Sequence, residues 1–250
     1  MRNYFNPDLK KILLIALFPC IFFSCKKDIT TNKNDIKLAA IDESSLKMPD
    51  GLTKIVLQTC EDDQIWYLLG NAGSYNNNLG QRNEVAIYSW SNNGYPAAAR
   101  GLYKFDSLSK IPSTAQVISA QLRLYGVPNS SYTPQGNSTY PGSPYNAYGD
   151  NTCIIQRIVK DNWYENTATW NTQPPRTKLD QDTIPPSTSQ WNYNVVVDVT
   201  KLVRRMVADS SANYGFRIKL LDESIYKSIV FASAQYADSS KRPKLVVNYK

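Results

Sequence analysis

Residues 117–125 read Val-Ile-Ser-Ala-Gln-Leu-Arg-Leu-Tyr and carry the clearest structural pattern in the chain. Apolar and polar side chains alternate along it: Ile118, Ala120, Leu122 and Leu124 share one side, and Ser119, Gln121, Arg123 and Tyr125 share the other. A period of two is typical of a strand with one buried and one solvated face. The stretch therefore predicts a strand of an antiparallel sheet.

Short segments of the same kind lie on both sides of this strand and are separated by polar turns. They are residues 53–59, 64–69, 85–90, 99–105, 153–159, 194–199, 215–221, 228–232 and 244–249. One helix is predicted where Val199, Leu202, Val203 and Met206 recur at helical spacing, with Thr200 as its N-cap. About ten short strands and one short helix predict an all-β fold, an antiparallel jelly-roll β-sandwich.

Residues 161–171, Asp-Asn-Trp-Tyr-Glu-Asn-Thr-Ala-Thr-Trp-Asn, also alternate and are predicted as a strand. Trp163 and Trp170 are seven positions apart, so strict alternation places them on opposite faces, and they cannot form one flat sugar-stacking platform unless a bulge intervenes. We expect at least one of these rings in the core. We also expect Glu165 in a hydrogen bond or ion pair that holds the fold, and Thr167 and Thr169 in strand-pairing positions.

The composition limits the chemistry that the protein can perform. Histidine is absent from the 250 residues, which removes the commonest general base and every Ser/His or Cys/His nucleophile pair. The net charge of +7 allows an anionic partner, and no stretch resembles a nucleic-acid-binding motif. The chain contains 17 Tyr against 7 Phe, an excess that suits half-exposed strand faces and binding loops.

The first 25 residues predict an export signal. Arg2, Lys10 and Lys11 precede an apolar run at residues 12–23, and Ser24-Cys25 follows. The ending at residues 22–25 resembles a bacterial lipobox, which implies that Cys25 is lipidated and anchors the protein to a membrane. We expect an outer-membrane or cell-surface lipoprotein, or otherwise a secreted protein, with a flexible linker at residues 26–51 and a folded domain at residues 52–250.

Two groups of side chains are candidates for binding a polysaccharide. The outward faces of three predicted strands carry cations that could pair with acidic sugars: Arg100, Lys104, Arg123, Arg217 and Lys219. A long loop at residues 126–151 carries tyrosines whose rings could lie against sugar C–H faces: Tyr132, Tyr140, Tyr145 and Tyr148. The alternatives are ordinary solvated strand surface for the cations and a loop that packs its own rings for the tyrosines.

Other polar residues suggest a metal site and a disulfide. Glu61, Asp62 and Asp63 are adjacent at a predicted strand end and could hold a structural calcium ion, although their spacing is not that of a calcium loop and a solvated turn is the alternative. No other cofactor is expected. Cys60 and Cys153 are the cysteines of the predicted domain and could form a disulfide in an oxidising compartment, or remain two buried thiols.

Five pieces of the predicted domain resemble the DNRLRE domain group, which overlaps carbohydrate-binding module family 96. They are Leu57-Gln58 with Glu61-Asp62, residues 104–108 with Ile111-Pro112, residues 119–125, residues 163–171, and residues 231–233 with 242–249. Their order and spacing agree over residues 52–250, but the string that names the family does not occur intact. The resemblance implies a jelly-roll β-sandwich on a secreted or surface protein, and binding of anionic polysaccharide in some relatives.

We therefore expect a tethered carbohydrate-binding module without catalytic residues, directed at an acidic polysaccharide. A structural or adhesive surface protein that binds an envelope protein is the first alternative. A polysaccharide lyase or hydrolase is the second, because Glu61, Asp62, Asp161 and Glu165 could supply carboxylates. These four acids form no motif of specific spacing, so catalysis is the weaker hypothesis.

Overall fold

The computed structural model describes residues 46–250, apart from residues 48–49, 161–162, 210 and 212. The predicted signal, Cys25, most of the predicted linker and Asp161 lie outside the described residues. Within the described part, no helix combines the length and apolar character that crossing a membrane requires.

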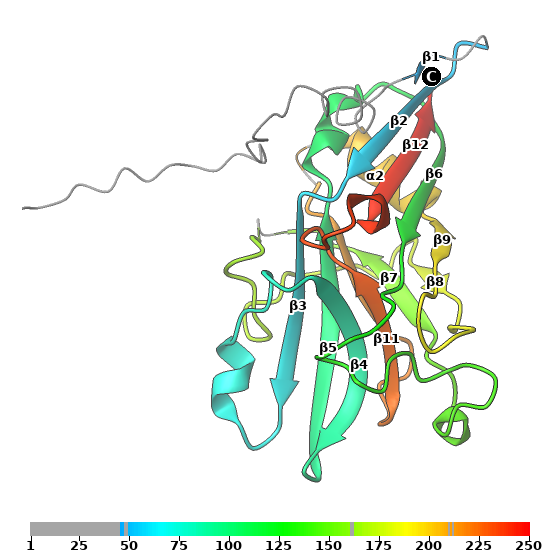
Figure 1. The fold of residues 1–250 in the computed structure, drawn as a ribbon. Helices are drawn as coiled ribbons and strands as arrows, with labels where there is room; N and C mark the ends of the chain where they lie inside the picture. The colour runs from blue at the N-terminus through cyan, green and yellow to red at the C-terminus, as the bar shows by residue number, and fades with distance from the viewer. Residues whose placement is uncertain (1–45, 48–49, 161–162, 210, 212) are drawn as a thin grey trace, which may run out of the picture. The chain divides into compact units, whose positions relative to one another are not determined.

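The smaller of the two antiparallel sheets has five strands (Figure 1). In spatial order they are β1 (Leu46–Lys47), β2 (Thr53–Gln58), β12 (Lys244–Tyr249), β6 (Val117–Leu124) and β9 (Val195–Asp198). The predicted alternation in β6 is confirmed at Ala120, Leu122 and Leu124, which are buried. A register shift against the end of β12 instead buries Val117 and leaves Ile118 exposed.

The larger sheet has seven strands, of which six follow one path: β11 (Lys227–Ala232), β4 (Glu84–Asn92), β5 (Tyr95–Lys104), β10 (Phe216–Leu220), β7 (Cys153–Arg157) and β8 (Asp182–Ile184). The seventh, β3 (Glu61–Leu68), pairs with the other edge of β5. The β4–β5 hairpin turns at Asn93 and Gly94, both with positive φ, as a two-residue hairpin turn of type I′ requires. β4 pairs with only the first half of β5, and β10 takes its place along the second half.

Short helices occupy the connections. The 3-10 helices are η1 (Ala72–Asn76), η2 (Asp106–Lys110), η3 (Asn146–Tyr148) and η5 (Ser239–Lys241), and the α-helix is α2 (Thr200–Ala208). The prediction that Thr200 is the N-cap is wrong, because Val199 holds that position. Thr200 is instead fixed by Asp198, whose Oδ1 accepts from the Thr200 backbone N–H at 2.8 Å.

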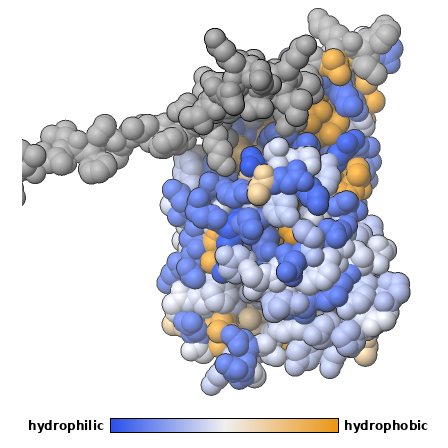
Figure 2. All heavy atoms as spheres, viewed as in Figure 1, coloured by the Kyte–Doolittle hydropathy of each residue, from blue (hydrophilic) through white to orange (hydrophobic). Residues whose placement is uncertain are grey.

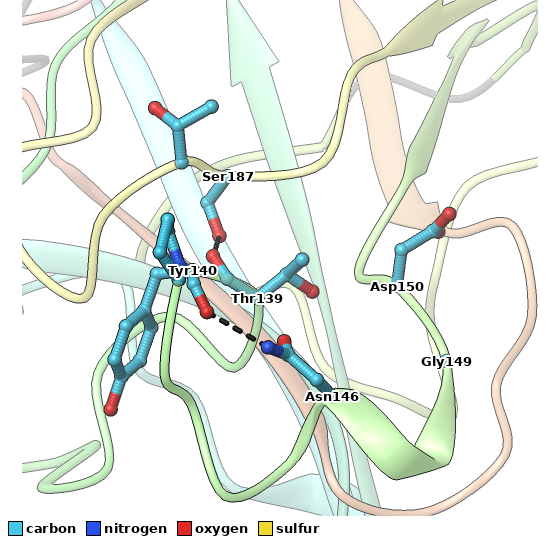
Figure 3. Close-up of a pocket in the computed structure, with 8 residues that line it drawn as sticks. Thr139, Tyr140, Asn146, Gly149, Asp150 and Ser187 are labelled. Carbon is cyan, nitrogen blue, oxygen red and sulfur yellow. Dashed lines mark hydrogen bonds between the residues drawn. The ribbon is translucent and has the colours of Figure 1, made fainter.

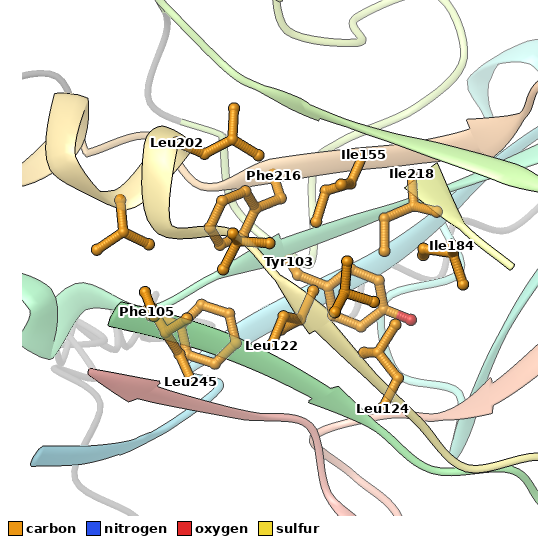
Figure 4. Packing of buried hydrophobic residues seen from close by; sticks show 14 of the residues in the cluster. Tyr103, Phe105, Leu122, Leu124, Ile155, Ile184, Leu202, Phe216, Ile218 and Leu245 are labelled. Carbon is orange, nitrogen blue, oxygen red and sulfur yellow. The ribbon is translucent and has the colours of Figure 1, made fainter. Parts of the chain in front are cut away.

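The main core lies between the sheets and beneath α2 (Figure 4). Phe105 and Phe216 meet edge to face with ring centroids 6.2 Å apart. Leu122 and Leu245 come from the smaller sheet, and Leu202 comes from α2. All five side chains are buried, so the apolar faces of the strands and of the helix meet in one layer.

Two irregular segments cover the outer face of the larger sheet. Residues 126–151 pack Val127 against Ala86, Val230 and Ala232 on β4 and β11. Residues 163–170 pack Trp163 and Ala168 against Ile65, Leu102 and Ile158. The sheet therefore carries a small apolar cluster on its outer face at each of these two places.

The prediction that the tryptophan stretch is a strand is wrong. From Trp163 onward it forms a turn, in which Thr167 N and Ala168 N both donate to Tyr164 O at 3.0 Å. Consequently Trp163 and Trp170 pack on the same cluster rather than on opposite faces.

The expectations for individual side chains of this stretch had mixed outcomes. Trp163 is buried, as predicted for at least one ring. Glu165 accepts hydrogen bonds from Gln81 Nε2 at 3.1 Å and Gln235 Nε2 at 2.8 Å, which confirms its structural role. Thr167 and Thr169 lie in no strand, so their predicted pairing is wrong. The predicted fold class, an all-β sandwich with one α-helix, is confirmed.

Candidate functional site

The five predicted cations do not form one face. Arg100, Arg217 and Lys219 lie on the outer face of the larger sheet, on β5 and β10. Lys104 is on the same face but is buried, with its Nζ 3.1 Å from Glu61 Oε1. Arg123 is on β6 of the other sheet. The structure thus brings three of the five together.

Glu223 pairs with two of the three cations that converge, Arg100 and Lys219. Arg100 donates to both of its carboxylate oxygens, Nε to Oε1 at 2.9 Å and Nη2 to Oε2 at 3.0 Å. Lys219 Nζ donates to Oε2 at 3.2 Å. Burial alone would raise the pKa of Glu223, but the hydrogen bonds and charges of Arg100 and Lys219 outweigh it and lower the pKa below its ordinary value.

Arg217 lies deeper, and its surroundings carry surplus positive charge. Its guanidinium donates to Gln156 Oε1 at 2.7 Å and to Gln173 Oε1 at 3.3 Å, while its Nε has no hydrogen-bond partner among the described residues. Desolvation by burial, together with the charges of Arg100 and Arg176, lowers the pKa of Arg217 to about 10 against the opposing charge of Glu223. We call Arg100, Arg176, Arg217 and Lys219 the basic cluster.

Aromatic rings border the basic cluster. The Arg100 guanidinium carbon lies 4.3 Å from the centroid of the Trp170 ring, a cation–π contact. The Tyr67 ring is 4.6 Å from Trp170 and 5.4 Å from Tyr75, nearly parallel to the latter. All three rings are partly exposed. Trp170 is thus on the border of a possible binding surface, although sequence reasoning assigned the tryptophan stretch a structural role alone.

The tyrosine loop contributes to a second aromatic group, which we call the ring cluster: Trp90, Tyr145, Tyr148 and Tyr226. The Tyr226 centroid is 4.7 Å from Tyr148 and 5.2 Å from Trp90, and the Trp90 centroid is 4.8 Å from Tyr145. Tyr148 is 49% exposed and the other three are half-buried. Sequence reasoning identified Tyr145 and Tyr148 but missed Trp90 and Tyr226, which lie on β4 and just before β11.

A pocket of about 390 Å³ lies beside the ring cluster (Figure 3). Its lining residues are Thr139, Tyr140, Pro141, Asn146, Gly149, Asp150, Ser187 and Thr188. Asn146 Nδ2 donates to Tyr140 O at 2.9 Å, and Figure 3 shows Asp150 on the opposite side of the pocket from Tyr140. Asn146 and Gly149 line the pocket, and Tyr148 of the ring cluster lies between them in sequence. The 3-10 helix η3 therefore forms a wall that the pocket and the ring cluster share.

The remaining predicted tyrosine lies apart. Tyr132 is 52% exposed, and the guanidinium of Arg82 lies 4.0 Å from its ring centroid. It neither lines the pocket nor contacts the rings of the ring cluster. The structure therefore brings together Tyr140, Tyr145 and Tyr148, but not Tyr132.

The structure does not bring the three adjacent acids together. Glu61, Asp62 and Asp63 lie in β3, where alternation directs Asp62 to the opposite face from Glu61 and Asp63, so the predicted solvated turn is wrong. In the described part of the chain, no group of three or more acids or cysteines is arranged to hold a metal ion. Desolvation by burial raises the pKa of Asp63 to about 8, despite hydrogen bonds from Gln64, Leu79 and Asn78.

The structure also contradicts the predicted disulfide, because Cys60 and Cys153 are not bonded to each other. Cys60 N donates to Lys104 O at 3.0 Å. The neighbouring Tyr103 on β5 is paired with Phe216 on β10, and Phe216 is paired with Arg157 on β7, so these three residues form one row across the sheet. Cys153 lies four residues from Arg157 along β7, or roughly 13 Å at the rise of a strand. Because Cys60 lies at this row and strands β5 and β10 separate it from β7, the two cysteines are farther apart than the Cα–Cα distance that a disulfide can span.

The fold and these surfaces define a class: an all-β sandwich whose partly exposed aromatic rings lie beside polar and charged side chains. Residues 144–249 match the family model described as carbohydrate-binding module family 96. This part of the chain is therefore similar to that family, as the sequence predicted, and the match supports a carbohydrate-binding module. A search of curated proteins found no match.

The matched part includes some of the binding candidates and excludes others. Tyr145, Tyr148, Arg217, Lys219 and Tyr226 lie within residues 144–249. Trp90 and Arg100 lie before the matched part, so their contribution rests on the geometry of the structure alone.

Proposed function

We propose that this protein is a carbohydrate-binding module that recognises an acidic polysaccharide through the basic cluster without altering it. The observation that carries the proposal is the surplus of cations: the charges of Arg100 and Arg176 both act on Arg217, and the one carboxylate that also acts on it, Glu223, is already paired with Arg100 and Lys219. A sugar carboxylate or sulfate would compensate the remaining positive charge. The similarity of residues 144–249 to carbohydrate-binding module family 96 supports the ligand class.

Lys219 and Arg176 are the members best placed to meet a ligand. The Lys219 side chain is 20% exposed, and Arg176 lies in an exposed segment. Arg100 is bound to Glu223 and Gln173, and Arg217 is bound to Gln156. These two guanidinium groups therefore contribute positive charge beneath the surface that a ligand would contact. The rings of Tyr67, Tyr75 and Trp170 could then support the C–H face of the same sugar chain.

The surface character agrees with a hydrated ligand. The face toward the viewer in Figure 2 is mostly hydrophilic, with apolar residues scattered over the described part in small patches. A protein-docking surface more often shows one larger apolar patch. Two of the candidate carboxylates for catalysis are otherwise engaged, since Glu61 pairs with Lys104 and Glu165 bonds Gln81 and Gln235.

Affinity electrophoresis through gels containing alginate, pectin or a sulfated glycan tests the proposal. We expect retardation that weakens with added salt. Lys219→Ala and Arg176→Ala should each lower the affinity about tenfold, as for loss of one charge-assisted hydrogen bond of about 1.5 kcal/mol. Lys201→Ala, which removes an exposed lysine from α2, is the control of equal charge. Equal effects of Lys219→Ala and Lys201→Ala would contradict a specific site.

We further propose that a lipid on Cys25 holds the module at the outer membrane or cell surface. The support is the sequence alone: a basic start, an apolar run and the Ser24-Cys25 ending. Labelling with radioactive palmitate, and its loss in Cys25→Ser, tests this. Binding of an envelope protein stays a prediction that a pull-down from envelope extracts would test.

A further inference from the structure

We propose that the ring cluster and its adjoining pocket form a second carbohydrate site, which binds an uncharged sugar unit. This inference rests on the proposed function only for the general class of ligand, because none of its residues belongs to the basic cluster. It assigns the stacking surface to Trp90, Tyr145, Tyr148 and Tyr226, and the hydroxyl-binding groups to the pocket behind η3.

The rings offer a surface suited to a sugar. Tyr148 is half-exposed and stands edge to face against Tyr226, with an interplanar angle of 64°, so one ring supports the other. Tyr226 holds its position at a φ of +70°, a backbone conformation that side-chain-bearing residues rarely adopt. Strain of this kind persists where the surroundings fix the residue, and it is concentrated at functional sites.

The pocket supplies fixed hydrogen-bonding groups. Asn151, fully buried behind it, donates to Ser187 Oγ at 2.7 Å and accepts from Ser187 N at 2.9 Å. Ser187 Oγ in turn donates to Thr139 O at 2.7 Å. Asp150 uses Oδ1 to accept from Thr152 N at 3.0 Å, and Oδ2 has no partner in the described part of the chain. A ligand therefore meets a wall that is already ordered.

The charge of the pocket selects an uncharged ligand. Asp150 is the one charged side chain among the described residues that line it, and no lysine or arginine does so. Lys227 lies just behind Gly149, but its Nζ is bound to Asp222 Oδ2 at 2.6 Å. Asp150 can accept hydrogen bonds from sugar hydroxyls, whereas it repels a sugar carboxylate. The volume of about 390 Å³ suits one sugar unit rather than a longer segment.

The test uses gels containing neutral polysaccharides, namely mixed-linkage β-glucan, xylan and galactomannan. We expect retardation by at least one of them that is insensitive to salt. Tyr148→Ala should weaken it about threefold to tenfold, as for loss of one aromatic contact. Tyr132→Ala removes an equally exposed tyrosine of the same loop and should leave it unchanged. Binding should also change tryptophan fluorescence, and Trp90→Phe should remove that change.

Each outcome separates this inference from the proposed function. Retention on alginate without retention on any neutral polymer overturns the second site and leaves the acidic site intact. Neutral binding that falls equally in Tyr132→Ala and Tyr148→Ala overturns it as well. If Lys219→Ala abolishes neutral and acidic binding together, there is one site and the inference is wrong. Neutral binding that is lost only in Tyr148→Ala supports it, even where acidic glycans do not bind.

Discussion

Replacing Trp163 tests whether the tryptophan stretch holds the fold. The Trp163 side chain is 4% exposed, packs with Ile65 and Leu102, and donates its indole N–H to Tyr214 O at 2.8 Å. Truncating a buried tryptophan to alanine costs about 3–5 kcal/mol, and a lost hydrogen bond adds about 1 kcal/mol. We therefore expect Trp163→Ala to lower the free energy of unfolding by about 4–6 kcal/mol.

Chemical denaturation and calorimetry measure this loss. For a domain of roughly 200 residues, the expected decrease of the melting temperature is about 8–24 °C. Trp163→Phe keeps most of the buried ring and should cost about 1–2 kcal/mol. Tyr164→Ala, at a neighbouring ring that is 50% exposed, should cost less than about 1 kcal/mol. A Trp163→Ala protein that melts within about 2 °C of the wild type but no longer binds glycan would refute the structural role.

Three further predictions concern buried groups. The pKa of Asp63 is about 8 in the folded protein and about 4 in the unfolded chain, so between these pH values the folded state binds one more proton than the unfolded state. The free energy of unfolding should therefore fall by up to about 1.4 kcal/mol per pH unit as the pH rises through that window. Urea denaturation at several pH values should show a weaker dependence of this free energy on pH in Asp63→Asn than in the wild type. Gly80→Ala should cost more than about 2 kcal/mol by thermal melting, because its Cβ would overlap Glu165 O, whereas Gly94→Ala has open space around it and only the strain of its positive φ. Mass spectrometry after alkylation of the native protein should find Cys153 unlabelled until unfolding, since it is fully buried and burial raises its pKa; rapid native labelling would contradict the packing of β7.

The sequence predicted those elements whose signal is local. Residues 117–125 alternate because one face of β6 meets the core, and that pattern needs no knowledge of the partner strands. The helix was recognised for the same reason, because Leu202, Val203 and Met206 recur at helical spacing on its buried side.

The tryptophan stretch misled because its alternation has no strand partner. Its conformation depends on distant groups: Glu165 N donates to Glu61 Oε2 at 3.0 Å, and Asn171 N donates to Tyr75 O at 3.1 Å. Neither contact can be inferred from the pattern of apolar and polar residues within the stretch. An apparent period of two in a short, polar, aromatic segment therefore does not distinguish a strand from a turn that is held by long-range contacts.

The acids of β3 were misread for a similar reason. Asp62 and Asp63 are polar and adjacent, which is typical of a solvated turn, yet both are buried. Their partners come from elsewhere in the chain: Asp62 Oδ2 accepts from Ala234 N, and Asp63 Oδ2 accepts from Asn78 Nδ2 at 2.9 Å. Likewise Trp90 and Tyr226 meet the predicted tyrosines only through folding, because Trp90 is 55 residues before Tyr145 and Tyr226 is 78 residues after Tyr148.

The segment between β10 and β11, residues 221–226, belongs to both proposed sites. Its Glu223 holds Arg100 and Lys219, and its Tyr226 contacts Trp90 and Tyr148. A ligand carboxylate that competes for Lys219 would weaken the hold on Glu223, and so on the segment that positions Tyr226, although Arg100 and Ser89 also hold Glu223. Thermodynamic linkage then requires that each ligand change the affinity of the other by the same factor. A heteropolymer with charged and uncharged units close together would bind with an affinity that neither homopolymer predicts.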